Sequence, residues 1–102
     1  MRLILFFDLP VKTKKERKIY ANFRKLLISK GYLMMQYSVY VKLFANRDAL
    51  KNHISFIKKN VPQEGHIRLA AMTEKQYANM EIIIGGRSRQ EEVITDEPMI
   101  LL

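Results

Sequence analysis

The chain opens with a run of five consecutive apolar residues at positions 3–7, followed at once by the carboxylate Asp8 and soon afterwards by Pro10. A short apolar run bounded in this way predicts a buried strand, because proline cannot continue a β-ladder. Asp8 is therefore expected at the C-terminal end of this strand. The pattern leaves two roles open for Asp8: a turn residue that caps local amides, or a group that carries out chemistry.

A helical period begins after Thr13. Thr13 and Glu16 have the spacing of a capping box, and Gly31 can supply the left-handed position that often follows a helix, so we expect a helix to about residue 30. At 100° per residue, its apolar side chains fall on one arc and most of its basic side chains fall outside that arc. The apolar arc contains Ile19, Tyr20, Phe23, Leu26 and Leu27, and the remaining surface contains Lys14, Lys15, Arg17, Lys18, Arg24 and Lys25.

The next segment, residues 32–44, is rich in residues that favour strands but is too long for a single strand. Its most polar point, at residues 36–38, predicts a hairpin with strands near 32–36 and 38–44. Asn46 is expected to cap a second helix over about residues 47–60. The buried stripe of that helix is predicted to contain Leu50, Ile54, Ile57 and Val61.

Alternation over residues 66–72 predicts another strand, with Ile67, Leu69 and Ala71 on one face. Thr73 and Gln76 form a second capping box, which predicts a short helical turn. Residues 81–84 are predicted to form a further strand that ends at the glycine pair 85–86.

The predicted order is β-α-β-β-α-β followed by one additional C-terminal strand, which is the α+β class with the ferredoxin-like pattern. This fold places two helices on one face of the sheet and leaves the other face open. The strand side chains on the open face include Tyr, Phe and Met, so we expect a homodimer with its two sheets facing each other. The predicted domain is residues 1–86.

Residues 87–102 differ in composition: an acidic segment precedes four apolar residues at 99–102. We expect this tail to dock on the dimer mate or on another protein, with a frayed end as the alternative.

The chain has 102 residues, enough for one domain, and it lacks cysteine, which excludes disulfides, thiolate metal sites and a cysteine nucleophile. The absence of cysteine fits a reducing cytosol, so a cytoplasmic protein is expected. No window approaches the roughly 20 apolar residues of a membrane span.

The charge is distributed unevenly along the chain. Residues 1–60 contain 14 Lys and Arg against three acids, giving +11, whereas residues 61–102 carry a net charge of −3. This polarity favours a nucleic acid partner for the N-terminal half, with a merely soluble basic surface as the alternative. Lys14, Lys18 and Lys25 stand nearly in line on the first helix. Because no base-reading motif accompanies them, binding is expected to be independent of sequence and strongly dependent on salt.

Asp8 is the candidate catalytic residue of the chain. In a homodimer, two Asp8 carboxylates could face each other, and their repulsion would be relieved by a Mg²⁺ ion bound between them. Such a site could activate water against a phosphodiester. His53 and His66 are interpreted as structural or surface residues, and Ser38 as a turn residue rather than a nucleophile.

Several of these stretches together resemble the small CRISPR-associated adaptation protein, the second Cas protein and partner of the CRISPR integrase. They are "RLILFFDLP" with Asp8 at the end of the strand, the basic first helix, the "QYSVY" hairpin and "LAAMTEKQYANMEIIIGG". The resemblance covers residues 1–86, and the tail looks like the version from type II-A systems.

The resemblance implies a homodimer with exchanged C-terminal strands that bridges two integrase dimers and lies along double-stranded DNA during spacer acquisition, a step of antiviral defence. In this role the chain is a scaffold, and its DNA contacts would come from Lys12, Lys14, Lys15, Arg17, Lys18 and Lys25. The alternative that the family implies is a Mg²⁺-dependent endonuclease, on RNA or DNA, with Asp8 as catalytic residue and metal ligand. A toxin-like ribonuclease and a regulatory domain of the same fold are further alternatives, and the basic charge disfavours a small-molecule regulator.

Overall fold

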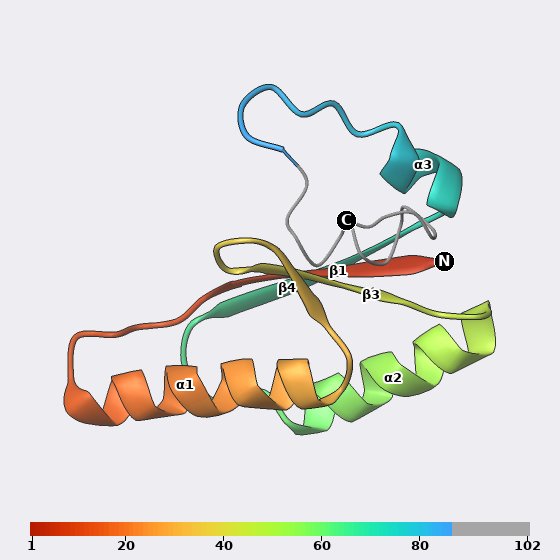
Figure 1. The fold of residues 1–102 in the computed structure, drawn as a ribbon. Coiled ribbons are helices and arrows are strands. Elements are labelled where there is room, and N and C mark those ends of the chain that lie inside the picture. The colour runs from red at the N-terminus through yellow and green to blue at the C-terminus, as the bar shows by residue number, and fades with distance from the viewer. Residues whose placement is uncertain (87–102) are drawn as a thin grey trace.

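A computed structural model describes residues 1–86 of the chain (Figure 1). The strands are β1 (Arg2–Asp8), β2 (Leu33–Gln36), β3 (Val39–Leu43) and β4 (His66–Met72), and the helices are α1 (Lys14–Ser29), α2 (Arg47–Lys59) and α3 (Glu74–Ala78). The predicted order β-α-β-β-α-β is confirmed, with α3 as the predicted short helical turn. The expected docking of the tail concerns residues 87–102, which lie outside the described residues.

The four strands form one sheet in the order β2-β3-β1-β4, and every pair of neighbours is antiparallel. This order places β1 in the centre, where Leu5 lies opposite Tyr40 on β3 and opposite Leu69 on β4. Helices α1 and α2 cover one face of the sheet, and α3 lies on the other side (Figure 1). The arrangement confirms the α+β class and the ferredoxin-like topology.

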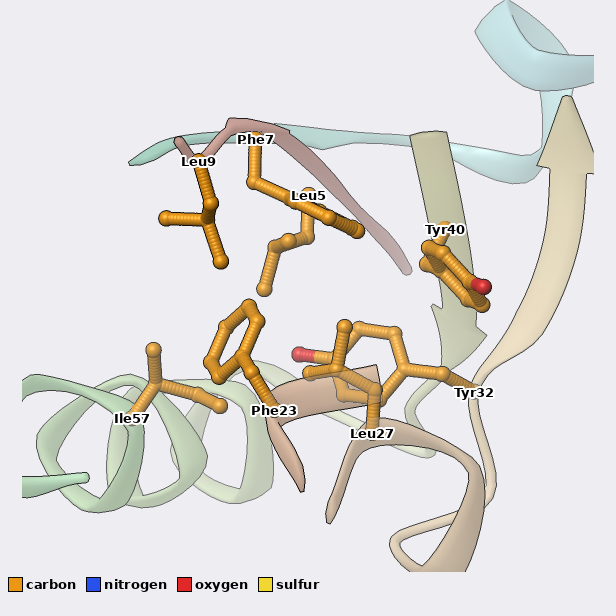
Figure 2. Packing of buried hydrophobic residues seen from close by; sticks show 8 residues of the cluster. All are labelled: Leu5, Phe7, Leu9, Phe23, Leu27, Tyr32, Tyr40 and Ile57. Atoms are coloured by element: carbon orange, nitrogen blue, oxygen red, sulfur yellow. The ribbon is translucent and has the colours of Figure 1, made fainter. Parts of the chain in front are cut away.

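The side chains of β1 alternate between the two faces of the sheet, as the period of a strand requires. Leu5 and Phe7 pack toward the helices in a core with Phe23, Leu27 and other buried side chains (Figure 2). On the opposite face, Ile4 packs with Val41 and Tyr77 beneath α3. Phe6 and Asp8 follow Ile4 on this second face and are exposed. The C-terminal end of β1 therefore presents Asp8 on the face that α1 and α2 do not cover.

Local signals in the sequence determine where the helices begin and end. The Thr13 hydroxyl accepts from the amide of Glu16 at 3.0 Å, and the Glu16 carboxylate accepts from the Thr13 amide at 2.9 Å, which confirms the capping box. Gly31 follows α1 with a φ of +90°, as predicted. The side chain of Asn46 accepts from the amide of Ala49 at the start of α2. The second capping box, at Thr73, is also confirmed.

The predicted strand at residues 81–84 is wrong for the single chain: the segment after α3 forms no β-ladder. A strand needs a neighbour for its amide and carbonyl groups, and no strand of the described chain pairs with this segment. Its isoleucines are left uncovered, with Ile83 83% exposed and Ile84 91% exposed.

Two residues assigned to buried helical stripes are instead exposed: Ile19 at 40% and Val61 at 38%. Ile19 lies at the edge of the apolar arc of α1 and Val61 lies beyond the end of α2, so the sheet covers neither of them. Together with Leu9 and Pro10 they line a groove of about 340 Å³ beside the start of α1. Ala71 is also exposed, on the edge strand β4.

Candidate functional site

The basic side chains predicted to meet nucleic acid lie on the solvent side of α1 and in the loop before it. All six, Lys12, Lys14, Lys15, Arg17, Lys18 and Lys25, are exposed. The ion pair found within residues 1–86 joins Arg2 to Glu74 on the other side of the molecule, so none of these six cations is ion-paired with a described carboxylate. We call these six residues the α1 basic surface.

Glu16 is the acid closest in sequence to this surface, and its carboxylate is hydrogen-bonded to backbone amides rather than paired with a cation. Its carboxylate accepts hydrogen bonds from the amides of Lys12 and Thr13, both at 2.9 Å. The Arg17 guanidinium donates to the carbonyl groups of Val11, at 3.2 Å, and Lys12, at 2.8 Å. Glu16 and Arg17 therefore fix the loop that carries Lys12 against the first turn of α1.

Lys14, Lys18 and Lys25 project from α1 within about 40° of one another around the helix axis, at 100° per residue. The 16 residues of α1 span about 24 Å at 1.5 Å per residue. The row from Lys14 to Lys25 covers about 16 Å of this length. Duplex DNA carries one negative charge per about 1.7 Å of its axis, so such a row can follow a phosphate backbone. The predicted alignment of these lysines thus corresponds to an exposed row that forms no ion pair with a described carboxylate.

The structure also reveals a basic residue that the sequence did not single out as a binding residue, Arg24. Its Nε donates to the Tyr40 hydroxyl at 2.9 Å, and this bond raises the pKa of the guanidinium. The sequence places Arg24 on α1 outside the apolar arc but gives no signal for its partner. Tyr40 comes from β3, 16 residues further along the chain, and only the fold brings the two together.

Asp8 is the last residue of β1, and its side chain is exposed. It is not a turn cap: it lies opposite His66 of β4 in the antiparallel register, and its carboxylate has no hydrogen-bond or ion-pair partner within residues 1–86. Side chains directly opposite each other have Cβ atoms about 4.5–5.5 Å apart. Asp8 and His66 therefore project side by side from the face of the sheet that α1 and α2 leave uncovered.

The turn before β4 holds this end of the sheet in place. Gly65 has a φ of +104°, and a Cβ atom there would lie 2.7 Å from the Asp8 carbonyl oxygen and 2.6 Å from Leu9 Cδ2. Only glycine permits both this backbone conformation and this close approach. The position of Asp8 at the end of β1 thus depends on Gly65.

A metal ion could use the Asp8 carboxylate, because its oxygen atoms are exposed and uncommitted. Within residues 1–86, no group of three or more His, Cys, Asp and Glu side chains comes together in the way that a protein-made metal cage requires. One carboxylate fits Mg²⁺, which keeps several water ligands. A single chain thus offers a sparse site, and the predicted pairing of two Asp8 residues would need a second copy.

The remaining candidates have structural roles, as predicted. The Tyr32 hydroxyl and His53 Nε2 are hydrogen-bonded at 2.8 Å, and the His53 ring packs on Phe44 and Phe56. Burial lowers the pKa of His53, as do the charges of Lys42 and Lys30. Ser38 has a φ of +64°, and its carbonyl accepts from the amide of Phe7 at 3.1 Å, so it shapes the β2–β3 hairpin.

Asp8 and the α1 basic surface are not brought together into one site. Asp8 projects from one face of the sheet, whereas α1 covers the other face and turns its lysines away from the sheet.

None of the helices within residues 1–86 has the length and apolar content that crossing a bilayer requires.

Comparison with known proteins identifies one family. A family model described as "CRISPR associated protein Cas2" matches residues 1–80. A protein of Treponema denticola is 49% identical over 102 residues, which cover all of both chains. A protein of Streptococcus mutans is 48% identical over 87 residues, covering 85% of this chain and 80% of the relative. A protein of Acidovorax ebreus is 40% identical over 94 residues, 92% of each chain. All three relatives are named "CRISPR-associated endoribonuclease Cas2".

Proposed function

The chain belongs to the CRISPR-associated Cas2 family, and on that basis we propose that it serves in spacer acquisition as a homodimeric scaffold for duplex DNA. The observation that carries the scaffold role is the α1 basic surface, whose six cations are exposed and have no described carboxylate partner. These side chains are five lysines and one arginine, and α1 has no cluster of amide and arginine side chains of the kind that reads bases. They suit a phosphate backbone of any sequence.

The test is the binding of labelled duplexes of unrelated sequence by fluorescence anisotropy at several NaCl concentrations. If six phosphates are neutralised, the slope of log affinity against log salt is expected near −5, from about 0.9 per contact. Charge reversal of Lys14, Lys18 and Lys25 to Glu should weaken binding equally for every duplex. A control variant with three exposed lysines outside α1 reversed, at Lys51, Lys58 and Lys75, keeps the same net charge. Equal losses in the two variants would remove the α1 basic surface from the proposal.

The proposed dimer would complete the segment after α3. Ile82, Ile83 and Ile84 are 51%, 83% and 91% exposed, and one edge of β4 has no neighbour in the described sheet. A hollow of about 470 Å³ lies between this segment and the open face, lined by Met35 and Tyr77 among others. A segment with strand-forming isoleucines that adds to the β4 edge of a second copy would pair its backbone groups and cover these side chains.

The oligomeric state in solution tests the dimer. Light scattering of the full chain should give twice the mass of one chain, and Ile82→Asp with Ile84→Asp should shift the mass toward the monomer. A full chain that remains monomeric at high protein concentration would exclude the strand exchange.

Residues 87–102 are proposed as the segment that docks on the integrase or on the dimer mate, with residues 1–86 as the folded domain. A chain that ends after Gly86 should keep its DNA affinity and lose assembly with the integrase. Retained assembly would place the docking surface within the domain.

The exposed Asp8 beside His66, together with the names of the relatives, favours a second candidate function: a Mg²⁺-dependent endonuclease. When bound, Mg²⁺ would supply a water of lowered pKa and would stabilise developing negative charge. Asp8 would hold the ion, in a dimer together with the second Asp8. The close approach of Gly65 would keep the Asp8 backbone in place.

Asp8→Asn should abolish Mg²⁺-dependent cleavage of RNA or DNA without changing the melting temperature by more than a few degrees. Asp48→Asn, which removes an exposed carboxylate from α2, is the matched control. Cleavage that survives Asp8→Asn would point to another site or to a contaminating nuclease.

A further inference from the structure

The flank of α1 that faces the β2–β3 hairpin carries an arginine that the fold holds in a fixed position. Arg24 Nε donates to the Tyr40 hydroxyl at 2.9 Å. Tyr40 is 1% exposed, and its ring stacks on Phe7 with 5.7 Å between the ring centroids. Tyr40 belongs to the main core cluster (Figure 2). An exposed guanidinium is thus tied to a side chain that cannot move without disturbing the core.

The Tyr40 bond uses only one part of the Arg24 hydrogen-bonding capacity. A guanidinium has five N–H groups, and the two terminal nitrogens of Arg24 have no partner within residues 1–86. The groups that act on its charge are Tyr40, Tyr20 and Tyr37, and no carboxylate is among them. Arg24 therefore presents oriented N–H donors at the surface, and no described carboxylate balances its positive charge.

Two further tyrosines, Tyr20 and Tyr37, are near enough to the Arg24 guanidinium to raise its pKa. Tyr20 lies one turn before Arg24 on α1, and its hydroxyl interacts with the side chains of Tyr37 and Ser38 at the tip of the hairpin. Tyr37 is 78% exposed. A guanidinium fork with adjacent hydroxyl donors matches the oxygen atoms of a phosphate group, which accept several hydrogen bonds at once.

We infer that Arg24, with the neighbouring Tyr20 and Tyr37 hydroxyls, forms a preformed binding site for one phosphodiester of a bound nucleic acid. The buried Tyr40 is the residue that positions Arg24. The inference rests on the proposed nucleic-acid-binding function and adds a contact outside the α1 basic surface. It differs from the lysine contacts in kind. A lysine is a mobile point charge, whereas Arg24 is oriented before the ligand arrives and loses less conformational freedom on binding.

The experiment measures the affinity of the full chain for a labelled duplex of mixed sequence, by anisotropy over a range of NaCl concentrations. Arg24→Gln should weaken binding and reduce the log–log salt slope by about 0.9, because one phosphate contact is lost. Tyr40→Phe should weaken binding by roughly threefold to tenfold with an unchanged slope, because the hydroxyl is removed but the charge remains. In the Arg24→Gln background, Tyr40→Phe should have no further effect.

Two further variants keep the test decisive. Tyr32→Phe removes another buried phenol hydroxyl, the partner of His53, and should leave DNA affinity unchanged although it too disturbs a core hydrogen bond. Arg24→Lys changes only an exposed side chain, so it should fold even if Tyr40→Phe does not. It keeps the charge and should lower affinity with an unchanged slope.

Three outcomes would overturn the inference. The first is full affinity and slope in Arg24→Gln. The second is a Tyr40→Phe effect of equal size with and without Arg24, and the third is an equal loss in Tyr32→Phe. If the wild-type chain binds and the lysine variants weaken it while Arg24→Gln does not, the inference fails and the proposed scaffold stands. If the wild-type chain binds no duplex at low salt, both fail.

Discussion

Replacing Gly65 with alanine tests how firmly the end of β1 is held. Two costs act at this position. The first is conformational, because Gly65 has a φ of +104°, where an L side chain costs about 1–2 kcal/mol. The second is steric, because the added Cβ would lie 2.7 Å from the Asp8 carbonyl oxygen and 2.6 Å from Leu9 Cδ2. Leu9 is buried in the main core cluster.

The magnitude follows from these contacts. To restore an ordinary contact of 3.4 Å, the Asp8 carbonyl must shift by roughly 0.7 Å, at the end of a strand that is paired on both sides. Strain of this kind in a packed interior costs about 1–3 kcal/mol. Alanine also reduces the freedom of the unfolded chain, which offsets about 0.4–1 kcal/mol. The expected net loss for Gly65→Ala is about 2–4 kcal/mol of the free energy of unfolding.

Gly31→Ala is the matched control, since Gly31 also has a positive φ, of +90°, but its near neighbour is the flexible end of Lys42. That variant should lose only about 0.5–1.5 kcal/mol. Urea unfolding followed by circular dichroism gives both values. If Gly65→Ala costs no more than Gly31→Ala, the close approach of Gly65 to β1 is not holding Asp8 in place, and the reasoning fails.

Two other predictions concern ionisable groups. Burial lowers the pKa of His53 below 6.5, so the folded chain keeps the ring neutral while the unfolded chain binds a proton. The contribution of His53 to stability is therefore present above pH 6.5 and is lost as the pH falls below it. His53→Gln should flatten the decline of unfolding free energy between pH 7 and 5, and an unchanged decline would contradict the assignment. Glu74→Gln should cost about 1–2 kcal/mol, because it removes the charged partner of the buried Arg2, whose Nε lies 2.7 Å from Glu74 Oε2. Arg2 lowers the pKa of Glu74, so the contribution of this ion pair to stability is present above pH 4.5 and is lost in acid. The prediction is wrong if Glu74→Gln lowers the free energy of unfolding no more than Lys75→Gln, a change of the neighbouring exposed residue, does.

The features that the sequence predicted correctly are those with local causes. A capping box needs residues three apart, so Thr13 marked the start of α1 without knowledge of the fold. The apolar run before Asp8 likewise identified a buried strand. The features that it missed depend on register and packing between distant segments. The pairing of Asp8 with His66 and the bond from Arg24 to Tyr40 join residues whose distance in space is set only by the order of the strands.

The segment at residues 81–84 lies between these two cases. Its run of isoleucines has a strong local preference for strand, yet it forms none in the single chain. Strand preference measures how well side chains pack on a pleated surface, and it is realised only where backbone groups find a partner. In the single chain, the segment with the strand preference does not meet a strand that could pair with it: its isoleucines are exposed, while one edge of β4 is unpaired. A second copy of the chain would bring the two together, so the same residues explain why a strand was predicted and why one chain alone does not contain it.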